Sequence, residues 1–189
     1  MNQVNLALIS LLFLKSSFKN DSFKASNQPI MKRNLILLLL LISTTLITAQ
    51  QEEETKQIKK VIETFFKGLH QGDSTIMKST FHKEIKIQTT NNKKEEKKIL
   101  KTDDVKKLLT GIANKKPENV YLEKLLSYDI KIDGNLASVW TPYEFYLNGN
   151  FSHCGANSFQ LFNNNGKWEI TYLVDMRRRD GCNALKAKK

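Results

Sequence analysis

Hydrophobic residues recur at helical spacing near the middle of the chain. In the segment EEETKQIKKVIETFFKGLHQGD, residues 52–73, one helix face carries Ile58, Val61, Ile62, Phe65, Phe66 and Leu69. This i, i+3, i+4, i+7 pattern is typical of an amphipathic helix packed against a core. Gly72 can end such a helix in a left-handed conformation. The pattern therefore predicts a first helix that ends near Gly72.

Two shorter helices follow the same logic. Asp73 can cap STIMKSTF, residues 74–81, which carries Ile76, Met77, Thr80 and Phe81 on its apolar side. Between the two, EIKIQTT alternates like a strand, and the polar NNKKEEKKIL is expected to be a loop or an edge hairpin. A third helix is predicted in TDDVKKLLTGIANKKP, residues 102–117, with Thr102 or Asp103 as its cap. Its apolar side is Val105, Leu108, Leu109 and Ile112.

The rest of the chain alternates with a period of two. Four strands are predicted: LLSYDIKI (125–132), LASVWTPYEFYL (136–147), NFSHCGANSFQLF (150–162) and KWEITYLVDMRR (167–178). The intervening DGN, NG and NNNG are hairpin turns, because Asn, Asp and Gly tolerate the positive φ that such turns need. Helices first and an antiparallel meander afterwards indicate an α+β domain with helices on one face of a curved sheet.

The turns also predict which side chains share a face. A four-residue turn at 163–166 places Phe162 opposite Lys167, and a two-residue turn at 148–149 places Leu147 opposite Asn150. The face toward the helices is then apolar at one end, with Phe159, Leu161, Trp168 and Ile170. Its other, polar end brings together Trp140, Glu144, His153, Asn157 and Tyr172. A bulge of one residue, which Pro142 could favour, would reverse the faces of a whole strand.

Three interpretations of the polar end remain open. Its side chains could form a structural hydrogen-bond cluster. They could instead form the wall of a ligand pocket, made of Trp140, His153, Asn157 and Tyr172. In the third interpretation, His153 and Glu144 are a catalytic pair for general acid–base chemistry, with the carboxylate orienting the imidazole.

A signal peptide is predicted from Met31. The stretch MKRNLILLLLLISTTLITAQ has a basic start, an apolar run from Leu35 to Ile47 and small residues up to Ala49. The apolar run is shorter than the ~20 residues of a membrane span, so we expect cleavage after Ala49 and no lasting anchor. Residues 1–30 are then an over-extended or disordered leader, and residues 50–189 are a single exported domain, secreted or periplasmic.

Charge and cysteines narrow the class of partner. Without residues 1–49 the chain loses five basic residues and one acidic residue, and its net charge falls from +11 to +7. No basic face interleaved with aromatics is apparent, so a nucleic-acid partner is not expected. Cys154 and Cys182 are an even pair in an exported protein, which predicts a disulfide. Ligands at metal-site spacing are lacking, so we expect neither a metal nor another cofactor.

The order of these segments resembles the nuclear transport factor 2-like superfamily, which includes ketosteroid isomerase, scytalone dehydratase and SnoaL-like polyketide cyclases. TPYEFYLNGNFSHCGANSFQLF, followed by tryptophan, isoleucine and GC at matching spacing, is similar to exported bacterial members described as putative lumazine-binding. The resemblance covers about residues 52–182 and implies a cone-shaped sheet around helices, with a pocket at its open end. It also implies a homodimer formed through the outer face of the sheet.

These observations predict an exported protein that binds a small, partly aromatic molecule without covalent chemistry. One alternative is an isomerase- or dehydratase-like enzyme that moves a proton with His153 and Glu144. The other is a dimeric interaction module without a ligand.

Overall fold

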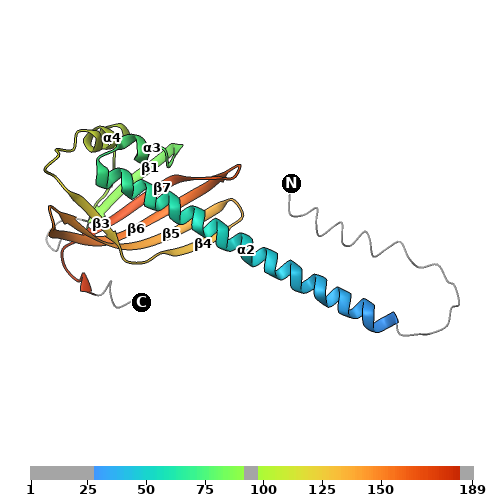
Figure 1. Cartoon of the computed structure of the whole chain (residues 1–189). Helices are drawn as coiled ribbons and strands as arrows, with labels where there is room; N and C mark the ends of the chain where they lie inside the picture. Colours follow the sequence, from blue (N-terminus) through green and yellow to red (C-terminus); the bar gives the residue numbers. More distant parts are fainter. Residues whose placement is uncertain (1–27, 92–97, 184–189) are drawn as a thin grey trace. The chain divides into compact units, whose positions relative to one another are not determined.

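The computed structural model describes residues 28–91 and 98–183 (Figure 1). The chain divides into two compact units, residues 1–46 and 47–189, and the folded core lies in the second. Most of the predicted leader, residues 1–27, lies outside the described residues. Among the helices that are described, none is long and apolar enough to cross a membrane. The signal peptide stays a prediction.

Helix α2 spans Gln28–Gln71 and carries the predicted apolar face into the core. Ile58, Ile62, Phe65 and Phe66 are buried, and Val61 and Leu69 pack beside them. The helix ends where Gly72 adopts a φ of 71°, in the left-handed region that glycine reaches without steric cost. The sequence pattern of this segment is therefore confirmed.

Two short helices follow, each capped by an aspartate. Asp73 caps α3, Ser74–Lys78, by accepting two backbone hydrogen bonds of 2.9 Å. The cap of α4, Val105–Ala113, is Asp104, and the prediction of Thr102 or Asp103 is wrong. Asp104 has an extended backbone and accepts from the amides of the first turn, as an N-cap must. Asp103 instead accepts a hydrogen bond from Thr89 and pairs with Lys101.

Seven strands form one sheet in the order β2-β1-β7-β6-β5-β3, with β4 also pairing with β5. β1 runs parallel to β7 and all other pairs are antiparallel. The bounds are β1 Phe81–Asn91, β2 Leu100–Thr102, β3 Tyr121–Leu125, β4 Asp129–Asp133, β5 Leu136–Leu147, β6 Asn150–Asn164 and β7 Lys167–Arg178. The sheet is curved (Figure 1), so the predicted α+β class is confirmed. The NNKKEEKKIL segment leads into the edge strand β2, although its residues 92–97 are not described.

The sequence pattern missed β3. β3 and β4 pair with the two halves of β5, one after the other. The chain bends between them at residues 126–128, where the Leu126 amide donates to the Pro142 carbonyl at 2.8 Å. This bend places Tyr128 beside the inner face of the sheet, meaning the face that packs against α2.

Two bulges change the predicted register. The turn after β6 has two residues, Asn165 and Gly166, both with positive φ, and not the predicted four. Beyond this turn, Leu161 pairs with Ile170, and Gln160 pairs with Tyr172. The β7 residue between Ile170 and Tyr172 therefore has no partner in β6. A second shift, in β6, leaves Ser152 without a partner across from β5. Each extra residue shifts the rest of its strand by one position, so the side chains that follow point to the opposite face of the sheet.

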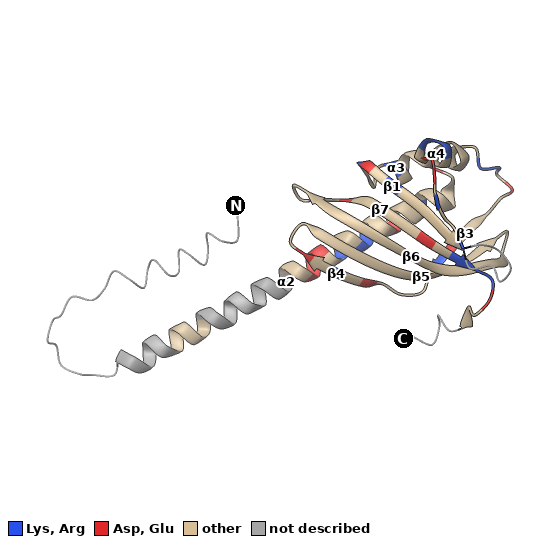
Figure 2. Ribbon diagram, turned by 180° about the vertical axis from the view of Figure 1, so that it is seen from behind, with Lys and Arg blue, Asp and Glu red and all other residues tan. Residues whose placement is uncertain are grey.

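The apolar end of the inner face carries the core. Phe159, Leu161 and Ile170 are fully buried and share one cluster with α2. Trp168 and Leu173 belong to the same cluster, whereas Tyr172, predicted at the polar end of this face, falls on the outer face because of the bulge in β7. Figure 2 shows this outer face of β5, β6 and β7, with α2 behind it.

Candidate functional site

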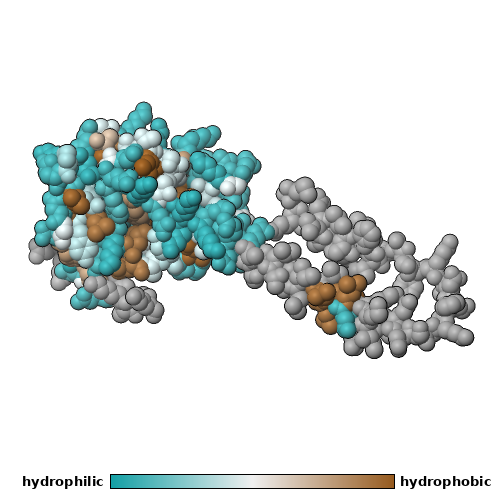
Figure 3. Space-filling model, viewed as in Figure 1, coloured by the Kyte–Doolittle hydropathy of each residue, from teal (hydrophilic) through white to brown (hydrophobic). Residues whose placement is uncertain are grey.

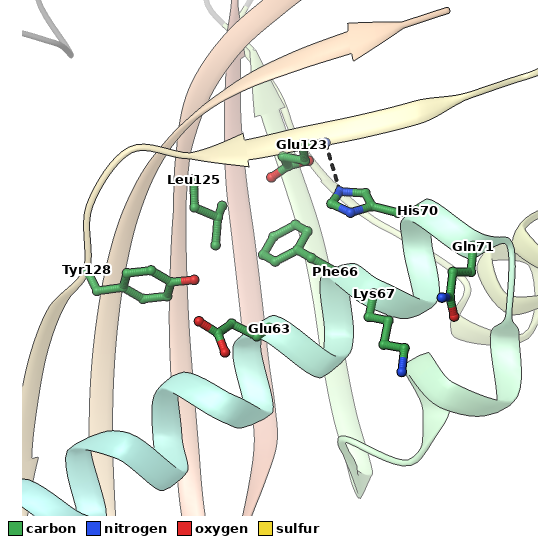
Figure 4. A pocket seen from close by; sticks show the side chains of 8 residues that line it. All are labelled: Glu63, Phe66, Lys67, His70, Gln71, Glu123, Leu125 and Tyr128. Carbon is green, nitrogen blue, oxygen red and sulfur yellow. Dashed lines mark hydrogen bonds between the residues drawn. The ribbon is translucent and has the colours of Figure 1, made fainter.

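A cavity of about 420 Å³ lies between α2 and β3, and we call it the α2–β3 cavity (Figure 4). Apolar side chains form one part of its wall, and two acids, a lysine, an amide and a histidine form the rest. It is lined by Glu63, Phe66, Lys67, His70, Gln71, Glu123, Leu125 and Tyr128. An apolar cavity with a few convergent polar groups is the usual form of a small-molecule site.

Local periodicity explains how these side chains meet. On α2 the lining residues Glu63, Phe66, Lys67 and His70 follow the i, i+3, i+4, i+7 spacing of one helix face. On β3, Glu123 and Leu125 are two residues apart, so both point to the inner face of the sheet. The cavity therefore lies beside the core and continues the face that buries Phe66.

Glu123 is the most deeply set acid of the cavity. Its backbone amide donates to Nε2 of His70 at 2.9 Å, which fixes the strand against the helix. Its carboxyl Oε1 accepts from Nδ2 of Asn157 at 2.8 Å. Burial raises the pKa of Glu123 to about 7, and the charge of Asp175 adds to this, while Asn157 and Arg177 oppose it. A carboxyl with this pKa can both bind and release a proton near neutral pH.

The neighbouring histidine is held in its neutral form. Burial lowers the pKa of His70. Because Nε2 accepts from the Glu123 amide, the ring proton of the neutral imidazole lies on Nδ1. His70 therefore positions β3, and it adds no positive charge to the cavity at neutral pH.

A second polar group lies on the inner face of the strands next to Glu123. Asp175 of β7 accepts from the Tyr143 hydroxyl at 3.4 Å and from Nε of Arg177. Burial, followed by the charge of Asp175, raises the pKa of the Tyr143 phenol, so the phenol stays protonated and donates. Gly155 makes room for this ring, since a Cβ there would lie 2.8 Å from the Tyr143 hydroxyl.

Two of the predicted site residues, His153 and Asn157, lie on the inner face as expected. Asn157 is buried and holds Glu123. His153 stacks on Phe145, with ring centroids 4.9 Å apart, and its Nδ1 lies 3.1 Å from the Ser152 hydroxyl. Burial and the charge of Arg177 lower the pKa of His153. His153 is not among the residues that line the α2–β3 cavity.

The other three predicted residues lie on the outer face. Glu144 pairs with Cys154 and accepts from the Tyr146 hydroxyl at 3.0 Å, so the predicted Glu144–His153 pair is wrong. Trp140 pairs with Ser158 and is 50% exposed. The Tyr172 hydroxyl donates to Oε1 of Gln88 at 2.6 Å. The bulge in β6 moves Glu144 and Trp140 away from His153 and Asn157, and the bulge in β7 moves Tyr172.

The predicted disulfide between Cys154 and Cys182 is present. It links β6 to the segment after β7. In the parts of the chain with described positions, no group of three His, Cys, Asp or Glu side chains could hold a metal ion.

Sequence reasoning missed Glu123, Leu125 and Tyr128. The only signal for β3 was the alternation in YLEKL, where exposed Leu122 and Lys124 separate the partly buried Tyr121, Glu123 and Leu125. An acid at an inward position of so short a strand gives no clear hydrophobic pattern. Only the pairing of β3 with β5 shows that Glu123 points inward.

Comparisons with known proteins agree with this fold. One solved structure is an NTF2-like protein of unknown function from Shewanella baltica OS155, with 21% identity, 68% of this chain and 96% of that chain covered, and a TM-score of 0.50. An NTF2-like protein with a cystatin-like fold from Novosphingobium aromaticivorans has 13% identity, coverages of 77% and 94%, and a TM-score of 0.55. A structure described as putative scytalone dehydratase from the same organism has 12% identity, coverages of 69% and 88%, and a TM-score of 0.53. At these identities the similarity shows the fold alone.

The search of curated proteins gave no match. A family described as putative lumazine-binding matches residues 53–172, which include α3, α4 and β1 to β6 in full. The chain therefore belongs to this family, and its fold is that of the NTF2-like structures.

Proposed function

We propose that the protein is exported and binds a small, partly aromatic molecule in the α2–β3 cavity. The observation that carries this proposal is the pairing of an apolar wall, Phe66, Leu125 and Tyr128, with the deeply set carboxyl of Glu123. Apolar area gives a ligand most of its binding energy, and one fixed polar group orients it. The family description, putative lumazine-binding, points to the same kind of role.

A proton-transfer enzyme is the second candidate, and Glu123 is its acid–base group in place of Glu144. A general acid–base residue works best when its pKa lies near the operating pH, and the Glu123 pKa of about 7 meets this condition. One structure of similar fold is described as a putative dehydratase of scytalone. Dehydration and isomerisation both require a group that takes a proton from one atom and returns it to another.

Export is supported by the sequence from Met31 to Ala49 and by the disulfide. Disulfides persist in oxidising compartments and are rare in the cytosol. We propose that cleavage after Ala49 leaves Gln50 as the first residue of the working protein.

A homodimer through the outer face of the sheet is the third part of the proposal. Leu136 and Trp140 of β5 lie on this face and are 53% and 50% exposed. The α2 side, shown in Figure 3, is mostly hydrophilic with separate small hydrophobic patches. Exposed aromatic and aliphatic side chains on one face suit a second copy better than open solvent.

Native mass spectrometry of the protein purified from its own host tests all three parts. We expect a dimer whose subunits begin at Gln50 and carry a reproducible extra mass that is lost on denaturation. The denatured chain should gain about two mass units on reduction, as one disulfide requires. A subunit that retains residues 31–49 contradicts export, and a monomer at micromolar concentration contradicts the dimer.

Two matched variants on β3 locate the ligand. Leu125→Trp fills the cavity and should abolish the extra mass. Leu122→Trp places the same side chain on the outward side of the strand, where Leu122 is 46% exposed, and should keep it. An extra mass that survives Leu125→Trp contradicts the cavity as the site. A protein that carries no extra mass but converts a substrate only when Glu123 is intact supports the enzyme.

A further inference from the structure

Two carboxyl groups border the apolar part of the α2–β3 cavity. Figure 4 shows Glu63 and Tyr128 pointing toward one another, with the Phe66 ring between them and Glu123. The charge of Glu63 adds to burial in raising the pKa of Tyr128 to about 12, which shows that this carboxylate acts on the cavity wall. The α2–β3 cavity therefore has an acid at each end and aromatic rings along its length.

The nearby lysines, Lys59 and Lys67, neutralise the carboxylates of the α2–β3 cavity only weakly. Lys67 also lines the cavity, but its backbone position on α2 is exposed and its side chain extends away from Glu123 and Phe66 in Figure 4. Lys59 pairs with Glu63 at 3.8 Å, but both side chains are at least half exposed, and such pairs are weak. The Lys59 ammonium also lies 5.1 Å from the centre of the Tyr128 ring. The chain itself thus shows that this ring accepts an ammonium group.

In the described part of the chain, no cationic side chain is hydrogen-bonded to the Glu123 carboxyl. Among the described residues, the Asn157 amide is its only side-chain hydrogen-bond donor. Arg177 is engaged by Asp175, so its charge reaches Glu123 only in part. The charged groups that act on Glu123 are Asp175 and Arg177 of β7, and the charge of Glu123 acts in turn on Tyr143 of β5. Glu63, Lys67 and His70 of α2 line the same cavity, and His153 of β6 lies on the same face of the sheet.

We infer that the α2–β3 cavity takes an organic cation, a flat ring that carries a protonated amine. The ring lies against Phe66 and Tyr128, and the ammonium group donates to the Glu123 carboxylate. Charge-assisted hydrogen bonds of this kind are about twice as strong as neutral ones, and the rings add a cation–π attraction. This inference rests on the proposed binding function and names the ligand class for the same cavity.

Binding of a cation requires Glu123 to be ionised, so affinity depends on pH. Because the folded pKa is about 7, the acid is protonated at pH 5.5 and mostly ionised at pH 7.5. A ligand that binds only the ionised form gains affinity as pH rises, by roughly 20-fold between these two values. Below the pKa each cation that binds also releases close to one proton.

Three probes of one shape test the inference: 2-phenylethylamine, 2-phenylethanol and 3-phenylpropanoate, which are cationic, neutral and anionic. Isothermal titration calorimetry with the full chain at pH 7.5 should show the amine binding at least tenfold more tightly than the alcohol, with the acid weakest. Glu123→Gln should remove both the preference and its pH dependence. Glu169→Gln is the matched control, because Glu169 is a buried acid in β7 whose partners are Lys167 and Asn164.

Other variants keep the test decisive if Glu123→Gln does not fold. Glu63→Gln changes an exposed residue and should lower the preference for the amine two- to threefold. Titration of the unmodified protein at pH 6.5 in two buffers of different ionisation enthalpy should show proton release with the amine and none with the alcohol. Equal affinities for the amine and the alcohol, or binding without proton release, overturn the inference.

The result also separates this inference from the proposed function. If the protein binds the alcohol or the acid best, and Leu125→Trp abolishes this binding, the proposed binding function stands. The inference that the ligand is a cation is then overturned. No binding of any probe at millimolar concentration, in a protein that carries an extra mass from its host, overturns the cation alone. No binding and no extra mass overturn both.

Discussion

Two neighbouring positions on the inner face of β6 differ in what holds them. Phe159 is fully buried and meets the rings of Phe65 and Phe66 edge-on at centroid distances of 5.8 Å and 6.2 Å. Asn157, two residues earlier, is also buried, but it holds the Glu123 carboxyl through one hydrogen bond of 2.8 Å. Packing contributes through area and has little directionality, whereas a hydrogen bond requires one register.

This difference explains why one end of the face is a core and the other a candidate site. At the apolar end the direction of each contact matters less, because apolar packing is non-directional. The polar end depends on the two bulges: the one in β7 brings Asp175 and Arg177 to the inner side, and the one in β6 sets its pairing with β5. Bulges are common next to functional sites, where they redirect a side chain.

The largest effect should come from the apolar end. Phe159→Ala removes a fully buried ring and should lower the free energy of unfolding by about 3–5 kcal/mol, measured by urea denaturation. Phe151→Ala, in the same strand but 47% exposed, is the control and should change it by less than about 1 kcal/mol. Similar losses in the two variants would show that the core does not lie where the structure places it.

A smaller effect should follow from crowding the polar end. In Gly155→Ala the new Cβ would lie 1.9 Å from the Met176 carbonyl oxygen and 2.8 Å from the Tyr143 ring, so β7 or the ring must move. We expect a loss of about 1–3 kcal/mol in the same assay. Gly111→Ala, in α4 with no atom near its Cβ, should instead stabilise by about 0.5–1 kcal/mol. A neutral Gly155→Ala would contradict the close packing of Tyr143.

The smallest effect is the pH dependence of Glu123. Its pKa is about 7 in the folded protein against 4.5 as its ordinary value, so between these pH values the folded state holds a proton that the unfolded chain has lost. The contribution of Glu123 to stability should therefore decrease as pH rises from 4.5 to 7, by on the order of 1–2 kcal/mol, whereas the lowered pKa values of His70 and His153 act in the opposite direction in all variants.

Urea unfolding at pH 5 and pH 7.5 measures this change, and Glu123→Gln should remove it. Glu169→Gln should retain it, because the Lys167 hydrogen bond lowers the pKa of Glu169 and confines its titration to more acidic pH. An identical pH profile in the unmodified protein and in Glu123→Gln would show that the carboxyl is not buried.

The sequence predicted the elements with a strong period well. The apolar face of the first helix, the cap at Asp73, the turn at Gly149 and the three long strands β5, β6 and β7 all follow from local patterns that act within a few residues. The strand predicted at 125–132 is instead divided between β3 and β4 by a bend. It also paired Cys154 with Cys182, since no other cysteines were available. His153 and Asn157 were placed on the correct face, because both belong to one strand and are four residues apart.

Local patterns could not predict on which face of the sheet Glu144, Trp140 and Tyr172 lie. Each of these predictions assumed that the strands pair residue by residue from the hairpin turn onward. One extra residue in β6 or β7 places the side chain on the opposite face. The turns gave no sign of these bulges, because a bulge depends on how two strands twist against each other along their whole length.

By itself, then, the sequence determined the helices, the long strands, the fold class and the disulfide, through periodicity, turn chemistry and cysteine count. The tertiary structure alone decided the candidate site. Glu123 comes from a short strand without a hydrophobic signal, and Asn157, 34 residues later, reaches it only because both strands pair with β5. Its raised pKa has the same origin, since burial comes from elements distant in the sequence and no local pattern records it.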